Sequence, residues 1–219
     1  MSWVSGRLAA FDIETTGVEV QTARLVSAAV LLLYDGQTVD ETFWLVNPGV
    51  AIPAAATRVH GITTQRAQAE GVSPALAVSQ ITDILADQTR QGVAIVVFNA
   101  RFDLTVLDRE ARRHGVATLL SRVGGEGRLR VVDPLVLDRQ LDRYRPGKRT
   151  LGAVCAHYGV ALQDAHAASG DALAAALLAV RLGAAFPDVG RTDLEVLHRQ
   201  QMVWAVEQAA SLEQYFRKK

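Results

Sequence analysis

Two acidic residues interrupt an apolar segment near the start of the chain. Asp12 and Glu14 lie in the run 8–14, which is otherwise apolar and stops at the turn-forming residues 15–17. In a β-strand, residues two apart point to the same side of the sheet, so these two carboxylates should converge. Two carboxylates that lose hydration together need a compensating positive charge, and a bound divalent metal ion would supply it. The alternative is an exposed strand end, where such a pair usually has no function.

Three further residues could join this pair. Asp103 follows a second apolar segment, and His166 and Asp171 lie five residues apart in the last third of the chain. Five residues correspond to a rotation of about 140° on a regular helix, so His166 and Asp171 do not share one helix face. We therefore expect Asp171 to point at the sheet from a helix, with His166 in the loop or first turn before it. Four carboxylates suit Mg²⁺ or Mn²⁺ better than zinc, which prefers cysteine and histidine ligands.

The elements that position these residues are predicted from periodicity, turns and capping residues. Three apolar or alternating segments come first, with the turn Asp35-Gly36 between the second and third, and predict antiparallel strands. Helical and extended segments then alternate, which is typical of parallel strands added to the same sheet. The expected strands are 8–14, 25–34, 38–46, 93–98 and 130–133. The expected helices are 73–88, 102–114, 134–141, 151–158, 165–185 and 192–219. The fold class is therefore α/β, a mixed five-stranded sheet flanked by helices.

Length and composition are those of a globular chain with one substantial core. The 219 residues are 49% apolar and 21% charged, with 23 basic and 23 acidic side chains. Cys155 has no internal disulfide partner, and residues 1–5 lack the pattern of a secretory signal, so we expect a cytoplasmic protein. The longest apolar stretch, 172–180, is far shorter than the roughly 20 residues of a membrane span, so we expect no membrane partner.

Charge is distributed unevenly along the chain. Residues 1–50 hold two basic and six acidic side chains, whereas residues 122–149 hold eight basic and four acidic side chains. An acidic beginning could bind a cation and a basic middle could bind a polyanion, for example through Lys148 and Arg149. Ordinary solvated surface is the simpler interpretation of the charge counts.

Three motifs resemble those of a known family. Residues 11–17 (FDIETTG), 99–103 (NARFD) and 166–172 (HAASGDA) look like the three exonuclease motifs of the DEDDh family, in the same order. Within it, they resemble the group that includes the proofreading epsilon subunits of bacterial DNA polymerase III. The resemblance extends from about residue 8 to residue 185. It implies a ribonuclease-H-like fold and 3′ to 5′ hydrolysis of single-stranded nucleic acid to nucleoside 5′-monophosphates.

The resemblance also implies a role for each motif residue. Two divalent metal ions, Mg²⁺ or Mn²⁺, would be the cofactors, and His166 would be the general base. The metal-binding acids would be Asp12, Glu14, Asp103 and Asp171. The substrate-binding candidates are Thr15, Thr16, His60, Asn99 and Phe102. Asp133 is a further acid at a strand end, and we leave it out because four acids already satisfy the family pattern.

Several alternatives remain at this stage. The expected substrate is a single-stranded DNA 3′ end, in proofreading or repair, with RNA trimming or oligoribonucleotide degradation as the alternative enzyme. A non-catalytic module that binds a DNA polymerase subunit is a third interpretation. We expect an exonuclease domain at 1–190 and a helical extension at 191–219. Its apolar stripe of Val203, Val206 and Ala210 should pack on the same domain, with a docked partner as the alternative.

Overall fold

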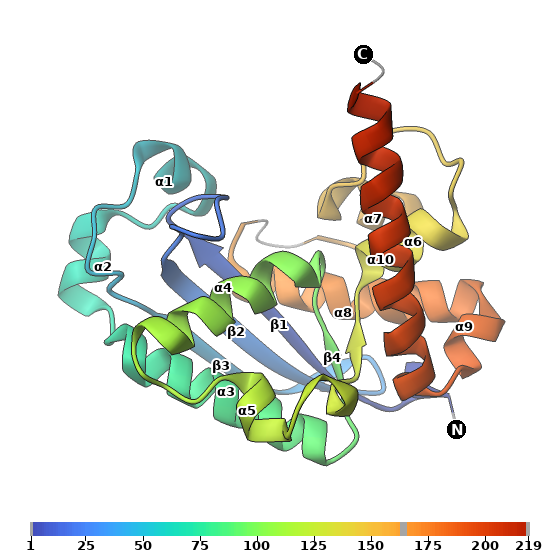
Figure 1. Ribbon diagram of the computed structural model, residues 1–219, viewed down its shortest axis with the longest axis horizontal. Helices are drawn as coiled ribbons and strands as arrows, with labels where there is room; N and C mark the ends of the chain where they lie inside the picture. Colours follow the sequence, from blue (N-terminus) through green and yellow to red (C-terminus); the bar gives the residue numbers. More distant parts are fainter. Residues whose placement is uncertain (1, 163–165, 218–219) are drawn as a thin grey trace.

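The computed structural model describes residues 2–162 and 166–217. Within them, five strands form one mixed sheet in the order β3-β2-β1-β4-β5 (Figure 1). The antiparallel strands are β1 (Arg7–Thr15), β2 (Leu25–Tyr34) and β3 (Gln37–Leu45), and the parallel additions are β4 (Ala94–Val96) and β5 (Val131–Val132). The predicted α/β class and mixed five-stranded sheet are therefore confirmed.

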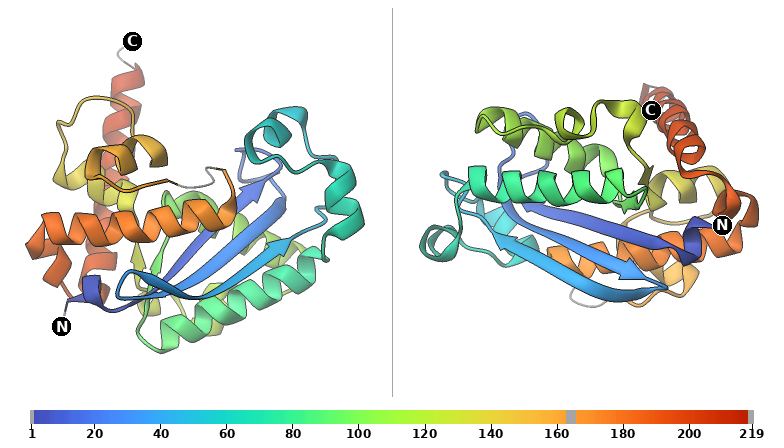
Figure 2. Two further views of the ribbon diagram at one scale, coloured as in Figure 1. Left: turned by 180° about the vertical axis from the view of Figure 1, so that it is seen from behind. Right: turned by 90° about the horizontal axis from the view of Figure 1, so that it is seen from below.

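Helices cover both faces of this sheet, so the fold has three layers: helices, sheet and helices. Figure 2 shows α3, α4 and α5 on one face and α8 on the other. Two short helices follow β3, and α10 runs along the β5 edge against β5 and α6. The helices are α1 (Ala54–His60), α2 (Thr64–Glu70), α3 (Pro74–Arg90), α4 (Ala100–Arg113), α5 (Leu119–Val123), α6 (Pro134–Leu141), α7 (Leu151–Tyr158), α8 (Ala168–Ala185), α9 (Pro187–Arg191) and α10 (Leu194–Arg217). Two short 3₁₀ turns are η1 (Trp3–Ser5) and η2 (Glu126–Arg128).

The alternation of side chains along β1 divides the core in two. Leu8 and Ala10 join the apolar cluster beneath α8, whereas Phe11 and Ile13 join the cluster beneath α3 and α4. Even-numbered residues of β1 therefore face α8, because successive side chains of a strand point to opposite faces.

Local sequence signals explain most of the boundaries. Asp35 and Gly36 both have positive φ, 49° and 73°, which is the geometry of a tight hairpin turn. The Ser73 side chain accepts the Leu76 N–H at 3.3 Å, and Pro74 occupies the first helical position, as predicted for α3.

The structure corrects three expectations. The predicted strand 93–98 is shorter in the structure, where β4 spans only Ala94–Val96. The last long helix before the C-terminal one begins at Ala168 rather than at residue 165, which lies outside the described residues. In α10, Val203 and Val206 are 57% and 70% exposed and Ala210 is also exposed, so the predicted stripe faces solvent. The helix packs instead through Leu197 and Gln201, because the β5 edge accepts a different face.

Helix α8 passes a length and composition test for a membrane span, with a mean hydropathy of 1.3. Half of it is buried inside the fold, and it packs on β1 and β2. Its apolar character is that of a helix covering a sheet.

Candidate active site

Three carboxylates meet where β1 ends beneath the start of α8. Asp12 and Glu14 are even-numbered residues of β1 and so share the side that faces α8. Asp171 lies in the first turn of α8. One ligand oxygen from each of the three residues lies within 4.8 Å of the others. The convergence predicted for Asp12 and Glu14 is therefore present, and Asp171 joins them.

Burial and mutual repulsion make this cluster costly in its ionised form. Burial, followed by the charges of Asp103, Asp171 and Glu14, raises the pKa of Asp12 well above its ordinary value. Burial and the charge of Asp171 raise the pKa of Glu14 to about 7. The pKa of Asp171 is also raised, chiefly by burial.

A divalent cation fits this donor set. Within residues 2–162 and 166–217, no arginine or lysine forms an ion pair with any of the three acids. Hard cations such as Mg²⁺ and Mn²⁺ bind carboxylate oxygens, and their charge would favour the ionised form of the acids against the burial and repulsion that disfavour it. The acidic cluster is therefore consistent with a metal site.

Asp103 lies beside the cluster but not within it. This buried residue of the first turn of α4 accepts the Ile13 N–H through Oδ1 at 3.2 Å. β1 pairs with β4 only over residues 8–10, so the Ile13 amide lies on an edge of β1 that β4 does not cover. Burial raises the pKa of Asp103, and the charge of Glu14 adds to this effect. Asp103 is thus close enough to interact with the other acids electrostatically.

His166 is placed as the helix geometry predicted. It precedes α8 in an exposed turn, with a positive φ of 66° that is uncommon for a residue other than glycine. Its backbone N–H approaches Asp171 Oδ1 at 3.4 Å. This contact and the charge of His166 both act to lower the pKa of Asp171, against the larger effect of burial. The turn therefore brings the histidine to the edge of the acidic cluster.

Thr15, Thr16 and His60 lie together at the end of β1. The Thr15 hydroxyl donates to the Gly17 carbonyl at 2.7 Å, and the Thr16 hydroxyl accepts the Arg24 N–H at 3.0 Å. Both hydroxyls thus stabilise the loop that follows the strand. The His60 ring accepts the Ile62 N–H at 3.1 Å. Burial lowers the pKa of His60, and the neighbouring Thr15 backbone opposes this.

Asn99 and Phe102 form a separate group at the start of α4. Both line a small pocket of about 340 Å³ with Arg101 and Arg109. Asn99 adopts a left-handed conformation, φ 65° and ψ 45°, immediately before the helix. The five substrate-binding candidates therefore occupy two places, one at the end of β1 and one at the start of α4.

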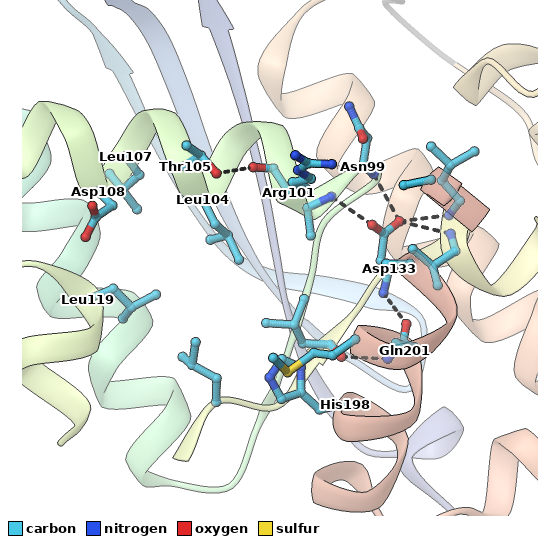
Figure 3. A pocket seen from close by; sticks show the side chains of 18 of the residues that line it. Asn99, Arg101, Leu104, Thr105, Leu107, Asp108, Leu119, Asp133, His198 and Gln201 are labelled. Carbon is cyan, nitrogen blue, oxygen red and sulfur yellow. Dashed lines mark hydrogen bonds between the residues drawn. The ribbon is translucent and has the colours of Figure 1, made fainter. Parts of the chain in front are cut away.

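Asp133 is the residue whose position the sequence interpretation missed. Its carboxylate is buried at the end of β5 and accepts the Asn99 N–H at 3.0 Å and the Ala100 N–H at 2.9 Å (Figure 3). It also caps α6 by accepting the Leu135 N–H at 2.9 Å. Asp133 is thus a positioning residue for the start of α4, and so for Asp103. An aspartate directly before proline is a helix-capping signal that predicts the α6 contact but not the contact with α4.

Helix α10 reaches this region through Gln201. Its side chain accepts the Asp133 N–H at 2.8 Å and donates to the Val131 carbonyl at 2.9 Å (Figure 3). Gln201 also lines a cavity of about 850 Å³ between α4 and α10, which Asn99 and Asp133 share. Asp12, Glu14 and Asp171 do not line this cavity, so the cavity is separate from the acidic cluster.

Acids contributed by β1, α4 and α8 at the end of a mixed sheet place this chain in the DEDD class of exonucleases. Residues 9–179 match the RNase_T family, described as "Exonuclease". The chain belongs to this exonuclease family, and the family resemblance of the three sequence motifs is confirmed.

The similar proteins include two kinds of DNA enzyme. The chain is 30% identical over 192 residues to the PolC-type DNA polymerase III of Streptococcus thermophilus, which covers 87% of this chain and 12% of the polymerase. Its fold is similar to that of Escherichia coli exonuclease I in complex with a dT13 oligonucleotide. The TM-score is 0.72 at 19% identity, covering 84% of this chain and 42% of that one.

Exonuclease I from Methylocaldum szegediense has a TM-score of 0.67 at 21% identity, covering 83% of this chain and 41% of that one. The chain thus spans about one eighth of the polymerase and about two fifths of the exonuclease I chains.

Proposed function

We propose that this protein is a metal-dependent 3′ to 5′ exonuclease that hydrolyses single-stranded DNA to nucleoside 5′-monophosphates. The observation that carries the proposal is the convergence of Asp12, Glu14 and Asp171 within 4.8 Å, with no basic side chain of the described residues paired to them. DNA is favoured over RNA because PolC-type polymerases and an exonuclease I bound to a DNA oligonucleotide are among the similar proteins. Proofreading or repair is the corresponding role.

The four motif acids have distinct positions in this proposal. Asp12, Glu14 and Asp171 would hold the divalent ions, and Asp103 would complete the set from the edge of β1. Two bound Mg²⁺ or Mn²⁺ ions would lower the pKa of an attacking water and neutralise charge on the phosphate. Asp133 keeps the start of α4 in place so that Asp103 stays beside β1.

His166 is proposed as the general base, which would assign the protein to the DEDDh branch. Its exposed turn lies at the edge of the cluster, and the Asp171 carboxylate accepts the His166 backbone N–H. A neutral imidazole can act as a general base because one of its ring nitrogens accepts a proton. The exposed position also leaves the histidine free to pass that proton to solvent.

The test is stepwise shortening of 5′-labelled single-stranded DNA with Mg²⁺ or Mn²⁺. The wild-type protein should shorten the strand one nucleotide at a time from its 3′ end. Asp12→Asn should abolish both cleavage and the thermal stabilisation by Mn²⁺, since it removes a central metal-binding oxygen. Retained shortening by Asp12→Asn would contradict the assignment of Asp12 to the metal-binding acids. No shortening by the wild type with either metal would contradict the exonuclease proposal and favour a non-catalytic binding module.

A second variant tests the base separately from the metal site. His166→Ala should lower turnover by roughly 10²- to 10⁴-fold, the usual contribution of a general base, while Mn²⁺ still stabilises the protein. His198→Ala, on α10, is the matched histidine control and should cleave like the wild type. Unchanged turnover of His166→Ala would remove the DEDDh assignment.

The choice between DNA and RNA needs matched substrates. Deoxyribo- and ribo-oligonucleotides of the same sequence would be compared for kcat/KM, because only contacts to the 2′-hydroxyl separate the two. A preference for the RNA strand would favour the oligoribonucleotide-degrading alternative.

A further inference from the structure

The loop between α6 and α7, residues 142–150, is held in place by ion pairs and hydrogen bonds to buried groups. Asp138, a fully buried carboxylate of α6, pairs with Arg145 at 3.1 Å and with Arg149 at 2.5 Å. Arg149 also donates to the Asp142 carbonyl at 2.7 Å, and His157 of α7 lies 3.1 Å from the Asp142 carboxylate. Arg145 and Arg149 therefore point into the protein, where their ion pairs with Asp138 stabilise the loop.

The remaining side chains of the loop point outward. Arg143 and Lys148 are exposed, and neither forms an ion pair with any carboxylate in the part of the chain that the structure describes. Between them, Tyr144 is 91% exposed. An aromatic ring this accessible on a supported loop is unusual, because a tyrosine normally buries much of its apolar surface.

The loop is connected to the acidic cluster through both of its helices. α6 begins directly after Asp133, whose carboxylate holds the start of α4, and α7 packs on α8, which carries Asp171. Figure 1 shows the loop extending beyond α6 and α7, away from the sheet. A strand that contacted both the acidic cluster and this loop would make the loop contact at some distance from its 3′ end.

We propose that this loop is a second contact site for single-stranded DNA, in which Tyr144 stacks on a base and Arg143 and Lys148 bind phosphates. The inference rests on the proposed exonuclease function and names a further part of its substrate site. Two cations beside an accessible aromatic ring are the combination that binds single strands without sequence preference. An acidic protein would match the cations but would not need the exposed ring, so the nucleic acid is the occupant that uses all three side chains.

The loop has two largely buried arginines and two exposed cations, and this difference supports the assignment. Ordinary solvated surface predicts that all basic residues of the loop extend into water. Instead, Arg145 and Arg149 have side-chain exposures of only 6% and 15%. Arg145 and Arg149 hold the loop backbone in one conformation. Less conformational entropy would therefore be lost when the exposed side chains of the loop bind a ligand.

The first experiment measures binding without cleavage. Metal-free protein in EDTA would be titrated into single-stranded DNA of about 16 nucleotides and of about 4 nucleotides, the range of common single-strand site sizes. Tyr144→Ala should weaken binding of the longer strand by roughly 5- to 150-fold, the usual effect of losing one base–aromatic stack, and should reduce the difference between the two lengths. Fluorescence anisotropy provides the Kd.

Tyr34→Ala is the matched control. Tyr34 is 58% exposed, but it pairs with Arg7 and so lies at the opposite end of β1 from the acidic cluster. This variant should bind both strands like the wild type. An equal loss for Tyr34→Ala and Tyr144→Ala would overturn the assignment.

The second experiment tests the cations. The double variant Arg143→Ala/Lys148→Ala should lower the slope of log Kobs against log salt concentration by about 1.4 in magnitude, about 0.7 for each cation removed from a single strand. An unchanged slope together with an unchanged Kd for Tyr144→Ala would refute the proposal and favour a protein ligand for the loop. Binding is measured without metal, so it does not depend on cleavage. If the wild type bound the longer strand more tightly but cleaved no DNA, the exonuclease function would be refuted and the loop contact would stand.

Discussion

Replacing Glu14 with glutamine tests whether the acidic cluster is under electrostatic strain in the absence of metal. The substitution keeps the shape of the side chain and removes one charge. In the folded protein, burial and Asp171 raise the pKa of Glu14 from an ordinary 4.5 to about 7. Between these pH values the folded chain keeps a proton that the unfolded chain releases.

The sign of the stability change follows from that difference in proton binding. The folded state binds more protons than the unfolded state in the window from 4.5 to about 7, so the free energy of unfolding falls as the pH rises through it. The loss is complete above about 7. Each pKa unit corresponds to about 1.4 kcal/mol, so the full shift would correspond to about 3 kcal/mol. Because Glu14 is partly exposed, solvent screening reduces this to about 1–2 kcal/mol.

The assay is thermal unfolding of metal-free protein at about pH 5 and about pH 8. Glu14→Gln should raise Tm at the higher pH by about 2–8 °C, since about 1 kcal/mol shifts Tm by about 2–4 °C in a chain of this size. At the lower pH the two proteins should differ much less. Mg²⁺ should stabilise the wild type more than the variant at the higher pH, because the cation relieves the same repulsion.

Glu41→Gln provides the matched control, since Glu41 is an exposed carboxylate on β3. It should leave the pH dependence of Tm as in the wild type. The reasoning would be refuted if metal-free Glu14→Gln were less stable than the wild type at the higher pH, or if both proteins lost the same stability between the two pH values.

Two further substitutions test the supports of the site and of the α6–α7 loop. Gln201→Leu should lower the free energy of unfolding in urea by about 1–3 kcal/mol, because the buried Asp133 N–H loses its acceptor, whereas Gln208→Leu removes a single bond to α6 and should cost less. Equal losses would show that the Asp133 contact has no special weight. Asp138→Asn should cost about 3–5 kcal/mol because it leaves two buried arginine partners without their counter-charge; a loss below about 1 kcal/mol would contradict this account of the loop.

The predictable part of the fold is the part that depends on neighbours along the chain. The hairpin of β2 and β3 follows from a positive-φ turn at Asp35 and Gly36 between two apolar segments. The start of α3 follows from Ser73 and Pro74 in the same way. Boundaries set by contacts with distant residues were less accurate, as the three-residue pairing of β4 shows.

In the candidate site, too, positions set by neighbours along the chain were predictable and positions set by distant residues were not. The side on which Asp12 and Glu14 lie follows from the period of a strand, and the separation of His166 from Asp171 follows from the pitch of a helix. The position of Asp103 does not follow from such a pattern. Its carboxylate accepts a hydrogen bond from the Ile13 N–H, 90 residues away in the sequence. This N–H is available because β1 pairs with β4 only over residues 8–10.

The sequence by itself determined the class of fold, the order of the elements and the identity of the acidic residues, because turns, caps and periodicity act within a few residues. Only the tertiary structure decided which arginines of the α6–α7 loop are buried, which face of α10 meets β5, and that Asp133 positions α4. These outcomes depend on partners that are distant in the sequence. Their hydrogen bonds form only after helices and sheet have packed, so no local pattern encodes them.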